Sequence, residues 1–290
     1  MVPSRNRLWK DDLQSEFEDT HQYFYGRAHR QARKPPRARS LKSLTEQGLK
    51  DPLAPKFGDP GLQALFKRGL IQDLFWQLGS GKEATVYVAR GPGGLYAAKL
   101  YVDSRVRSFK NDAVYRQGRY IRNQRVEKAI EQRSEFGISV QNYLWVEEEY
   151  RQLRFLRQAG VPVPTPVAHA GNVVLMEFIG DEDGPAPRLF EAKLTPGEAG
   201  EAFDQAVQNL GLMVRAGRVH GDYSTFNLLW WEGKVVVIDF PQVVELDRNP
   251  WAEMILQRDV SGLCRTFGHL GHRADPREVL CRVMQIARGV

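Results

Sequence analysis

Two acids and an amide stand near one another late in the chain, in the run H-G-D-Y-S-T-F-N and at the end of the apolar run that follows it. They are Asp222, Asn227 and Asp239. Carboxylate and amide oxygens are ligands for Mg²⁺, and a further carboxylate can accept or orient the proton of an attacking hydroxyl. These residue types predict magnesium-dependent phosphoryl transfer, with Asp222 facing the hydroxyl and Asn227 and Asp239 holding the metal.

The spacing of these residues makes the prediction specific. Asp222 and Asn227 are five apart, which is the interval in the catalytic loop H-R-D-L-x-x-x-N of protein kinases. A predicted hairpin at 228–238 follows, and Asp239 comes where a kinase has the Asp of D-F-G. A hairpin with a capping Asp and a solvated loop would explain each residue alone, but not all three at these intervals.

A lysine within an apolar strand supplies the positive charge that phosphates require. Lys99 lies in L-Y-A-A-K-L-Y, where its amine is unfavourable unless it reaches water or an acidic partner. We expect it to contact the α- and β-phosphates and to pair with a glutamate of the predicted helix 144–159. Glu147, Glu148 and Glu149 all lie near the start of that helix, and its periodicity leaves the choice among them open.

Short strands precede this helix. Three are predicted at 74–78, 84–89 and 95–101, and a further hairpin at 167–178 follows the helix. The turn G-S-G-K-E between the first two strands can cover a phosphate, because glycine lets backbone N–H groups approach closely. It is not a P-loop, since Glu83 stands where that motif requires Ser or Thr.

The second half of the chain is predicted to be helical. A long helix is expected at 196–216, where Thr195 and Glu198 have capping-box spacing, and two more helices between 250 and 290. The acidic, proline-containing stretch 180–187 separates these helices from the strands. The pattern therefore predicts an α+β protein in which a strand-rich half precedes a helical half.

Composition is that of a soluble globular protein, with 290 residues, 42% hydrophobic and 26% charged. No apolar run reaches the length of about 18 residues that a membrane span requires. Cys264 and Cys281 do not suggest a disulfide framework, and the start of the chain lacks the apolar core of a signal peptide. We expect a cytoplasmic protein that has no membrane partner.

The net charge of +6 is concentrated in two stretches. The stretch from Gly26 to Lys42 contains seven Lys or Arg residues and no Asp or Glu. A second basic region runs from Arg105 to Arg133. Such stretches attract polyanions, nucleic acid above all. A solvated tail and a solvated helix face remain the alternative explanation.

Five motifs in order resemble the RIO family of atypical protein kinases, nearest its first subfamily and bacterial-type members. They cover about residues 62–270 and read G-S-G-K-E-A-T-V-Y, A-A-K-L-Y, M-E-F-I-G followed by P-A-P, H-G-D-Y-S-T-F-N and I-D-F-P-Q-V-V-E. The resemblance implies a two-lobed protein-kinase-like α+β fold, RIO type, with an antiparallel-sheet N-lobe and a mainly helical C-lobe. It also implies ATP and Mg²⁺ as cofactors and serine/threonine protein kinase activity, with autophosphorylation and ATP hydrolysis.

The resemblance also assigns roles to single residues. It makes Asp222, Lys99 and Asn227 catalytic, picks Glu149 as the partner of Lys99, and keeps Asn227 and Asp239 as the metal ligands. The other residues that it places at the nucleotide are Ser80, Gly81, Lys82 and Glu83 of the glycine turn, and Glu177 and Ile179, whose backbone groups would meet adenine.

Composition, turn residues and the resemblance together divide the chain into three parts. Residues 1–60 are expected to be a basic, partly disordered extension and linker, residues 61–179 the N-lobe, and residues 180–290 the C-lobe. Within the N-lobe, a basic flexible loop at 104–140 would offer Ser104 or Ser108 as sites of self-phosphorylation.

The chain departs from the family pattern at two places. Tyr223-Ser224-Thr225 stands for the usual Leu-Ser-Glu, and Asp239-Phe240-Pro241-Gln242 for Asp-Val-Ser-Gln. Neither change removes an assigned chemical group, but Pro241 removes a backbone donor beside the metal site. The departures therefore bear on substrate preference more than on catalysis.

Two other functions remain open. A small-molecule phosphotransferase of the aminoglycoside or choline kinase kind has a similar loop, H-G-D-x-x-x-x-N, although Lys82-Glu83 and the P-A-P run speak against it. A non-catalytic, ATP-gated assembly factor would instead bind ribosomal RNA or a ribosomal particle through the basic stretches. The kinase itself would act on a protein substrate or on its own chain, as a ribosome-linked switch.

Overall fold

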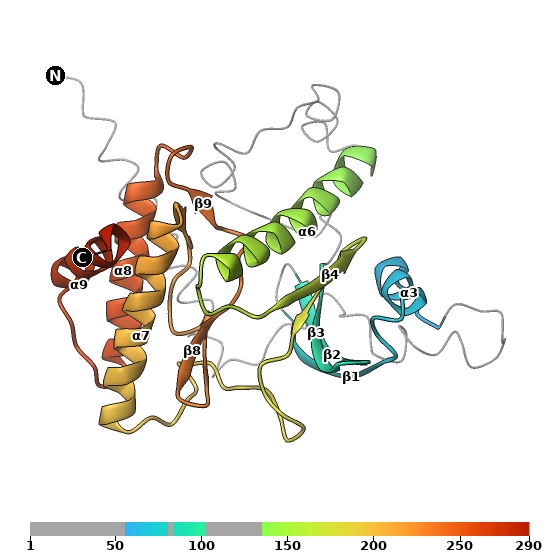
Figure 1. The fold of residues 1–290 in the computed structure, drawn as a ribbon, viewed down its shortest axis with the longest axis horizontal. Coiled ribbons are helices and arrows are strands. Elements are labelled where there is room, and N and C mark those ends of the chain that lie inside the picture. The colour runs from blue at the N-terminus through green and yellow to red at the C-terminus, as the bar shows by residue number, and fades with distance from the viewer. Residues whose placement is uncertain (1–55, 81–83, 102–134, 290) are drawn as a thin grey trace, which may run out of the picture. The chain divides into compact units, whose positions relative to one another are not determined.

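The computed structural model describes residues 56–80, 84–101 and 135–289, all within one compact unit, residues 41–290 (Figure 1). Three sequence predictions fall wholly or largely outside these residues. They are the N-terminal extension at 1–60, the turn residues Gly81, Lys82 and Glu83, and the basic loop at 104–140 with Ser104 and Ser108.

A five-stranded antiparallel sheet carries Lys99 on its middle strand. The strand order is β1-β2-β3-β5-β4, with β1 at Asp73–Ser80, β2 at Ala84–Gly91, β3 at Gly94–Tyr101, β4 at Pro166–Ala170 and β5 at Val173–Glu177. Lys99 on β3 lies opposite Val86 on β2 and Val174 on β5. Strands on both sides therefore fix the lysine backbone, and the predicted strands are confirmed to within a few residues.

Two helices accompany this sheet. The short helix α3, Pro60–Lys67, begins where the Asp59 carboxylate accepts the amides of Gly61 and Leu62, at 2.9 and 3.1 Å. The long helix α6, Glu135–Gln158, contacts β4 and β5. The predicted start of α6 at residue 144 was wrong, because apolar periodicity is weak along α6 as a whole and marks its beginning poorly.

Three helices follow in the second half: α7, Pro196–Arg215; α8, Ala252–Gly268; and α9, Pro276–Arg288. The predicted capping box is present, since the Thr195 hydroxyl accepts the Glu198 amide while the Glu198 carboxylate accepts the Thr195 amide. Helix α7 packs on α9, and Figure 1 shows α7, α8 and α9 gathered together. The helical second half is therefore confirmed.

Two pairs of short strands flank the loop 220–227. The predicted hairpin is confirmed as β7, Leu228–Trp231, paired with β8, Lys234–Val237. A second pair, β6, Arg218–Val219, and β9, Val244–Glu245, was not predicted. Two residues are too few for any periodic signal, and this pairing depends on contacts between distant parts of the chain.

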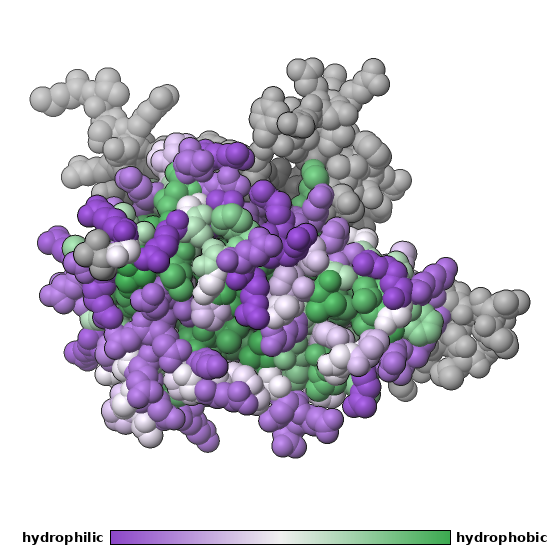
Figure 2. Space-filling view, viewed as in Figure 1, coloured by the Kyte–Doolittle hydropathy of each residue, from purple (hydrophilic) through white to green (hydrophobic). Residues whose placement is uncertain are grey.

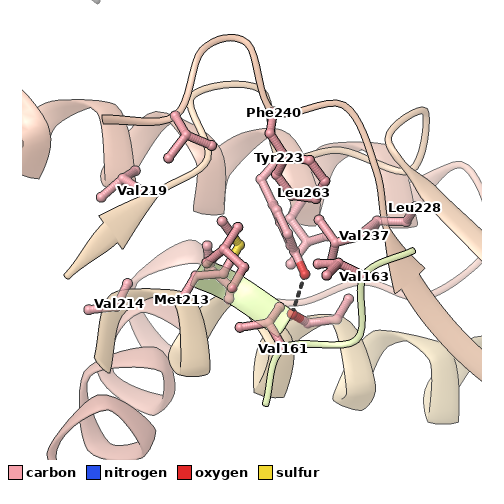
Figure 3. Close-up of a cluster of buried hydrophobic side chains, with 14 of the residues drawn as sticks. Val161, Val163, Met213, Val214, Val219, Tyr223, Leu228, Val237, Phe240 and Leu263 are labelled. Carbon is pink, nitrogen blue, oxygen red and sulfur yellow. Dashed lines mark hydrogen bonds between the residues drawn. The ribbon is translucent and has the colours of Figure 1, made fainter. Parts of the chain in front are cut away.

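A buried apolar cluster supports the loop 220–227 (Figure 3). The loop's Tyr223 is itself buried in the cluster, and its hydroxyl donates a hydrogen bond of 2.8 Å to the Ala206 carbonyl of α7, drawn as the dashed line. Both packing and a hydrogen bond of Tyr223 therefore anchor the loop on the apolar cluster. Members of the cluster that are labelled in Figure 3 come from the segment after α6, from α7, from the β7–β8 hairpin and from α8, among them Val161, Val163, Met213, Leu228, Val237 and Leu263.

Hydrophilic residues predominate at the periphery of the face shown in Figure 2, and hydrophobic residues show between them. Among the described residues, most large apolar side chains are buried, and only a few are exposed, such as those of Phe75, Trp76 and Phe190. None of the described helices has both the length and the apolar character that crossing a membrane demands.

The contact between α7 and α9 yields a stability prediction. A β-carbon on Gly211 of α7 would meet Ile286 side-chain atoms at 2.5 and 2.6 Å. Gly211→Ala should therefore lower the free energy of unfolding by about 1–3 kcal/mol, in spite of the higher helix propensity of alanine. Urea denaturation of the purified variant measures this change.

Gly200 of the same helix provides the matched control. The nearest atom to a β-carbon there is Nδ1 of His272, at 4.0 Å. Gly200→Ala should therefore raise the free energy of unfolding by up to about 1 kcal/mol, because alanine restricts the unfolded chain. Equal effects of the two substitutions would contradict the close α7–α9 packing at Gly211.

Candidate active site

The ammonium group of Lys99 joins two carboxylates that come from distant segments. Its Nζ donates to Oε1 of Glu149 on α6 at 2.6 Å and to Oδ1 of Asp239, after β8, at 2.7 Å. Tyr101, two residues along β3, donates its hydroxyl to the other oxygen of Glu149. The structure thus brings together three of the residues predicted for the site.

The neighbouring glutamates of α6 have other surroundings. Glu148 accepts hydrogen bonds from Arg151 and Gln152, at 2.9 and 2.6 Å, and Glu147 is exposed. Glu149 is buried and faces β3. The choice that periodicity left open is therefore decided by which side of α6 packs on the sheet.

Electrostatic interactions keep the side chains of Lys99 and Asp239 charged at neutral pH. Burial disfavours the ammonium form of Lys99, but the carboxylates of Asp239 and Glu149 outweigh it and raise the pKa of Lys99 well above its ordinary value. Desolvation likewise opposes ionisation of Asp239, but the charge of Lys99 and its hydrogen bond hold the pKa of Asp239 below the usual range. The lysine and Asp239 therefore stabilise each other's charged forms.

The β7–β8 hairpin places Asn227 beside Asp239. Asn227 directly precedes β7, Asp239 lies just beyond β8, and the amide of Ile238 donates to the Asn227 carbonyl at 3.0 Å. Asp239 has φ of 70°, a left-handed conformation that is uncommon for a residue other than glycine. An unusual backbone held in place by the surrounding structure often accompanies a functional side chain.

Asp222 and Asn227 contact each other across the loop 220–227. The Asn227 amide nitrogen donates to the backbone carbonyl and to Oδ2 of Asp222, both at 2.9 Å. Burial and the nearby charge of Asp239 raise the pKa of Asp222, against the lowering effects of Arg258 and Asn227. This contact uses the amide nitrogen of Asn227 and not its side-chain oxygen, which is the atom that a metal ion would bind.

Two residues of α8 hold this loop, and neither was predicted from the sequence. The buried Asp259 carboxylate accepts the amides of Gly221 and Tyr223, at 2.8 and 3.2 Å, and Arg258 donates to the Gly221 carbonyl. An acid on the apolar face of a predicted helix, between Leu256 and Val260, was the available signal. It did not reveal which loop the carboxylate would contact.

The remaining predicted nucleotide residues are only partly within the described chain. Ser80 contacts Thr85 through their hydroxyls at 3.1 Å, at the ends of β1 and β2 that flank the glycine turn. The Glu177 amide donates to the Thr165 carbonyl at 2.8 Å, and the Ile179 carbonyl accepts the Ala186 amide at 2.9 Å. Each of these last two residues thus has one backbone group engaged by the protein.

The described part of the site offers oxygen donors suited to magnesium, but no cluster of several metal-binding side chains. Within 56–80, 84–101 and 135–289, no group of three or more His, Cys, Asp or Glu residues has metal-binding geometry. Magnesium commonly takes only one or two protein carboxylates and fills its other positions with phosphate oxygens and water. Asn227 and Asp239, which the β7–β8 hairpin brings to the same end of its strands, have the side-chain oxygens that such a site uses.

The fold and these groups define a two-lobed, protein-kinase-like protein, and comparison with known proteins agrees. A family model, the RIO domain, matches residues 85–279. The chain is 33% identical to the serine/threonine-protein kinase rio1 of Schizosaccharomyces pombe, over 72% of this chain and 41% of that protein. It is 32% identical to the RIO-type serine/threonine-protein kinase Rio1 of Haloferax volcanii, over 76% of this chain and 72% of that protein. The chain belongs to the RIO domain family.

Solved structures support the same fold. The Rio2 kinase of Chaetomium thermophilum aligns with a TM-score of 0.58 at 21% identity, over 79% of this chain and 71% of that one. Its ADP/Mg²⁺-phosphoaspartate complex aligns with a TM-score of 0.57. The predicted two-lobed RIO-type fold is therefore confirmed. The chain spans about two fifths of the length of several curated relatives, among them the kinases of S. pombe and Caenorhabditis elegans.

A buried histidine at the start of the loop 220–227 predicts how stability depends on pH. His220 lies between Tyr223 and Phe240 with its Nε2 at 3.1 Å from the Ile238 carbonyl, and burial lowers its pKa to about 4. An unfolded histidine binds a proton near pH 6.5. The unfolded chain therefore gains protons first, and stability should fall by up to about 3 kcal/mol as the pH drops from about 6.5 to about 4.

His220→Gln should remove this part of the pH dependence. Urea denaturation at pH 7 and pH 4.5 compares the variant with the wild type, and the difference between the two pH values should be smaller in the variant. An unchanged difference would show that His220 does not produce the effect.

Proposed function

We propose that the chain is an ATP- and magnesium-dependent serine/threonine protein kinase of the RIO type. It transfers the terminal phosphoryl group of ATP to a hydroxyl of a protein or of its own chain, and also hydrolyses ATP. The observation that carries this proposal is the contact of Lys99 with both Glu149 and Asp239, next to the Asp222–Asn227 pair. Phosphoryl transfer depends mainly on positioning and electrostatic stabilisation, which such a set of fixed charges can supply.

Each residue then has a distinct task. Lys99, oriented by Glu149, binds the α- and β-phosphates, while Asp222 orients the acceptor hydroxyl and accepts its proton. Asn227 and Asp239 hold Mg²⁺, which when bound neutralises phosphate charge. The raised pKa of Asp222 agrees with a carboxyl suited to receive a proton.

The nucleotide base would lie against the segment after β5. With the Glu177 amide and the Ile179 carbonyl engaged by the protein, adenine is proposed to bind the Glu177 carbonyl and the Ile179 amide. The turn formed by Ser80, Gly81, Lys82 and Glu83 is proposed to cover the phosphates, since Ser80 ends β1 at the same edge of the sheet.

The partners and the site of action are further parts of the proposal. Protein hydroxyls, including those of this chain, are the proposed acceptors. The basic stretches at 26–42 and 105–133 are proposed to bind ribosomal RNA or a ribosomal particle in the cytoplasm, because clustered cations attract phosphate backbones. Both stretches lie outside the described residues.

Removing the charge of Asp222 tests the reaction. Asp222→Asn should abolish phosphoryl transfer while leaving the ATP affinity within a few-fold of the wild type, because its carboxylate faces the acceptor and not the nucleotide. The measurement is incubation with γ-labelled ATP, following label to protein, to free phosphate or to an added acceptor. Undiminished turnover would contradict the role of Asp222, and label on a small alcohol or aminoglycoside alone would favour a small-molecule phosphotransferase.

Replacing Asp239 tests the metal site. Asp239→Ala should weaken ATP binding in the presence of Mg²⁺ and bring it close to the affinity measured without the metal, because a ligand of Mg²⁺ is lost. Isothermal titration with and without Mg²⁺ measures this. Asp204→Asn is the control, since Asp204 is an exposed acid paired with Arg282 at 2.8 Å on the helical side of the protein. Equal magnesium dependence in both variants would argue against Asp239 as a ligand.

A further inference from the structure

A network of charged side chains and one side-chain amide joins α6 to the two short strands β6 and β9. The centre of the network is Gln152 of α6, which is 1% exposed. Its amide nitrogen donates to Glu148 on the same helix at 2.6 Å, and its amide oxygen accepts from Nε of Arg218 on β6 at 3.0 Å. A buried amide whose donor and acceptor both have partners fixes the geometry between the elements that it joins.

Glu245 on β9 adds a second set of contacts between the same elements. It accepts a hydrogen bond from Arg151 of α6 at 3.3 Å and forms an ion pair with Arg218, in which the nearest nitrogen and oxygen lie 3.4 Å apart. The Arg218 guanidinium also lies 4.3 Å from the ring centroid of Phe155 on α6. Arg218 has only 12% of its side chain exposed, so this planar cation is held on several sides by α6 and β9.

The places of these residues in the chain give the network its significance. On α6, Glu149 lies between Glu148 and Gln152, less than one turn from each. On β6, Arg218 and Val219 run directly into His220 and the loop that carries Asp222. Strand β9 follows Asp239 closely and pairs with β6, so that Arg218 lies opposite Glu245.

We propose that Arg218 and Gln152 are positioning residues for phosphoryl transfer, acting by fixing the helix that carries Glu149 relative to the loop that carries Asp222. The proposal rests on the proposed function and adds residues that the sequence motifs do not include. Lys99 contacts Glu149 on α6 and Asp239 after β8, so a shift of α6 relative to the segment after β8 would displace its ammonium group. A displacement of about 1 Å in such an arrangement can cost on the order of 100-fold in rate.

A double-mutant cycle tests this link. Arg218→Met and Gln152→Leu should each lower kcat/KM for transfer from ATP about 10- to 100-fold, mainly through kcat, in protein whose circular dichroism shows it to be folded. If the two residues act as one link, the double variant should lose no more than the worse single variant. Arg218→Lys, which keeps a cation that reaches toward Glu245, should restore part of the activity lost in Arg218→Met.

Two exposed arginines provide a matched comparison that does not disturb buried groups. Arg151 and Arg248 both contact Glu245 and are 56% and 60% exposed, but only Arg151 belongs to α6. Arg151→Ala should lower activity several-fold, whereas Arg248→Ala should resemble the wild type. This pair carries the test if Gln152→Leu or Arg218→Met fails to fold.

The outcomes separate the two proposals. A wild-type chain without phosphoryl transfer would overturn the proposed function. An active wild type would overturn the positioning role if the variants of Arg218 and Gln152 kept its rate, if their losses multiplied in the double variant, or if Arg151→Ala and Arg248→Ala had equal effects.

Discussion

The site depends on one buried cation shared by two anions. Lys99 on the middle strand of the sheet holds Glu149 and Asp239 at 2.6 and 2.7 Å, and its own side chain is only 11% exposed. A buried ammonium without partners would be strongly unfavourable, so the two carboxylates stabilise Lys99 in its position. The sheet, helix α6 and the β7–β8 hairpin must therefore all assume their positions for this group to be stable.

The loop that bears Asp222 is held mainly through its backbone. Asp259 accepts two of its amides, Arg258 contacts a carbonyl, and Tyr223 anchors it in the apolar cluster of Figure 3. Gly221 has φ of 87°, and a β-carbon there would come within 2.5 Å of the Gln242 carbonyl. Because most of these contacts use backbone groups, the side chains of Asp222 and Asn227 do not take part in them and instead contact each other.

Elements with a strong local signal could be predicted from the sequence, and elements without one could not. The strands of the sheet, the β7–β8 hairpin and the capping box of α7 were found because periodicity and caps are properties of neighbouring residues. The strands β6 and β9 were missed because they are two residues long. Their importance comes from Arg218 and Glu245, whose contacts with α6 no local pattern encodes.

The sequence by itself determined which chemical groups the site contains and the order in which the chain presents them. The interval from Asp222 to Asn227 and the hairpin leading to Asp239 are short-range features, so their proximity follows from local structure. The family resemblance pointed to Glu149 as the partner of Lys99, but only the tertiary structure shows the face of α6 that brings it there, and only the tertiary structure shows that Asp259 supports the loop. These contacts join residues far apart in the chain, and they form according to which face of α6 and α8 is buried against its neighbours.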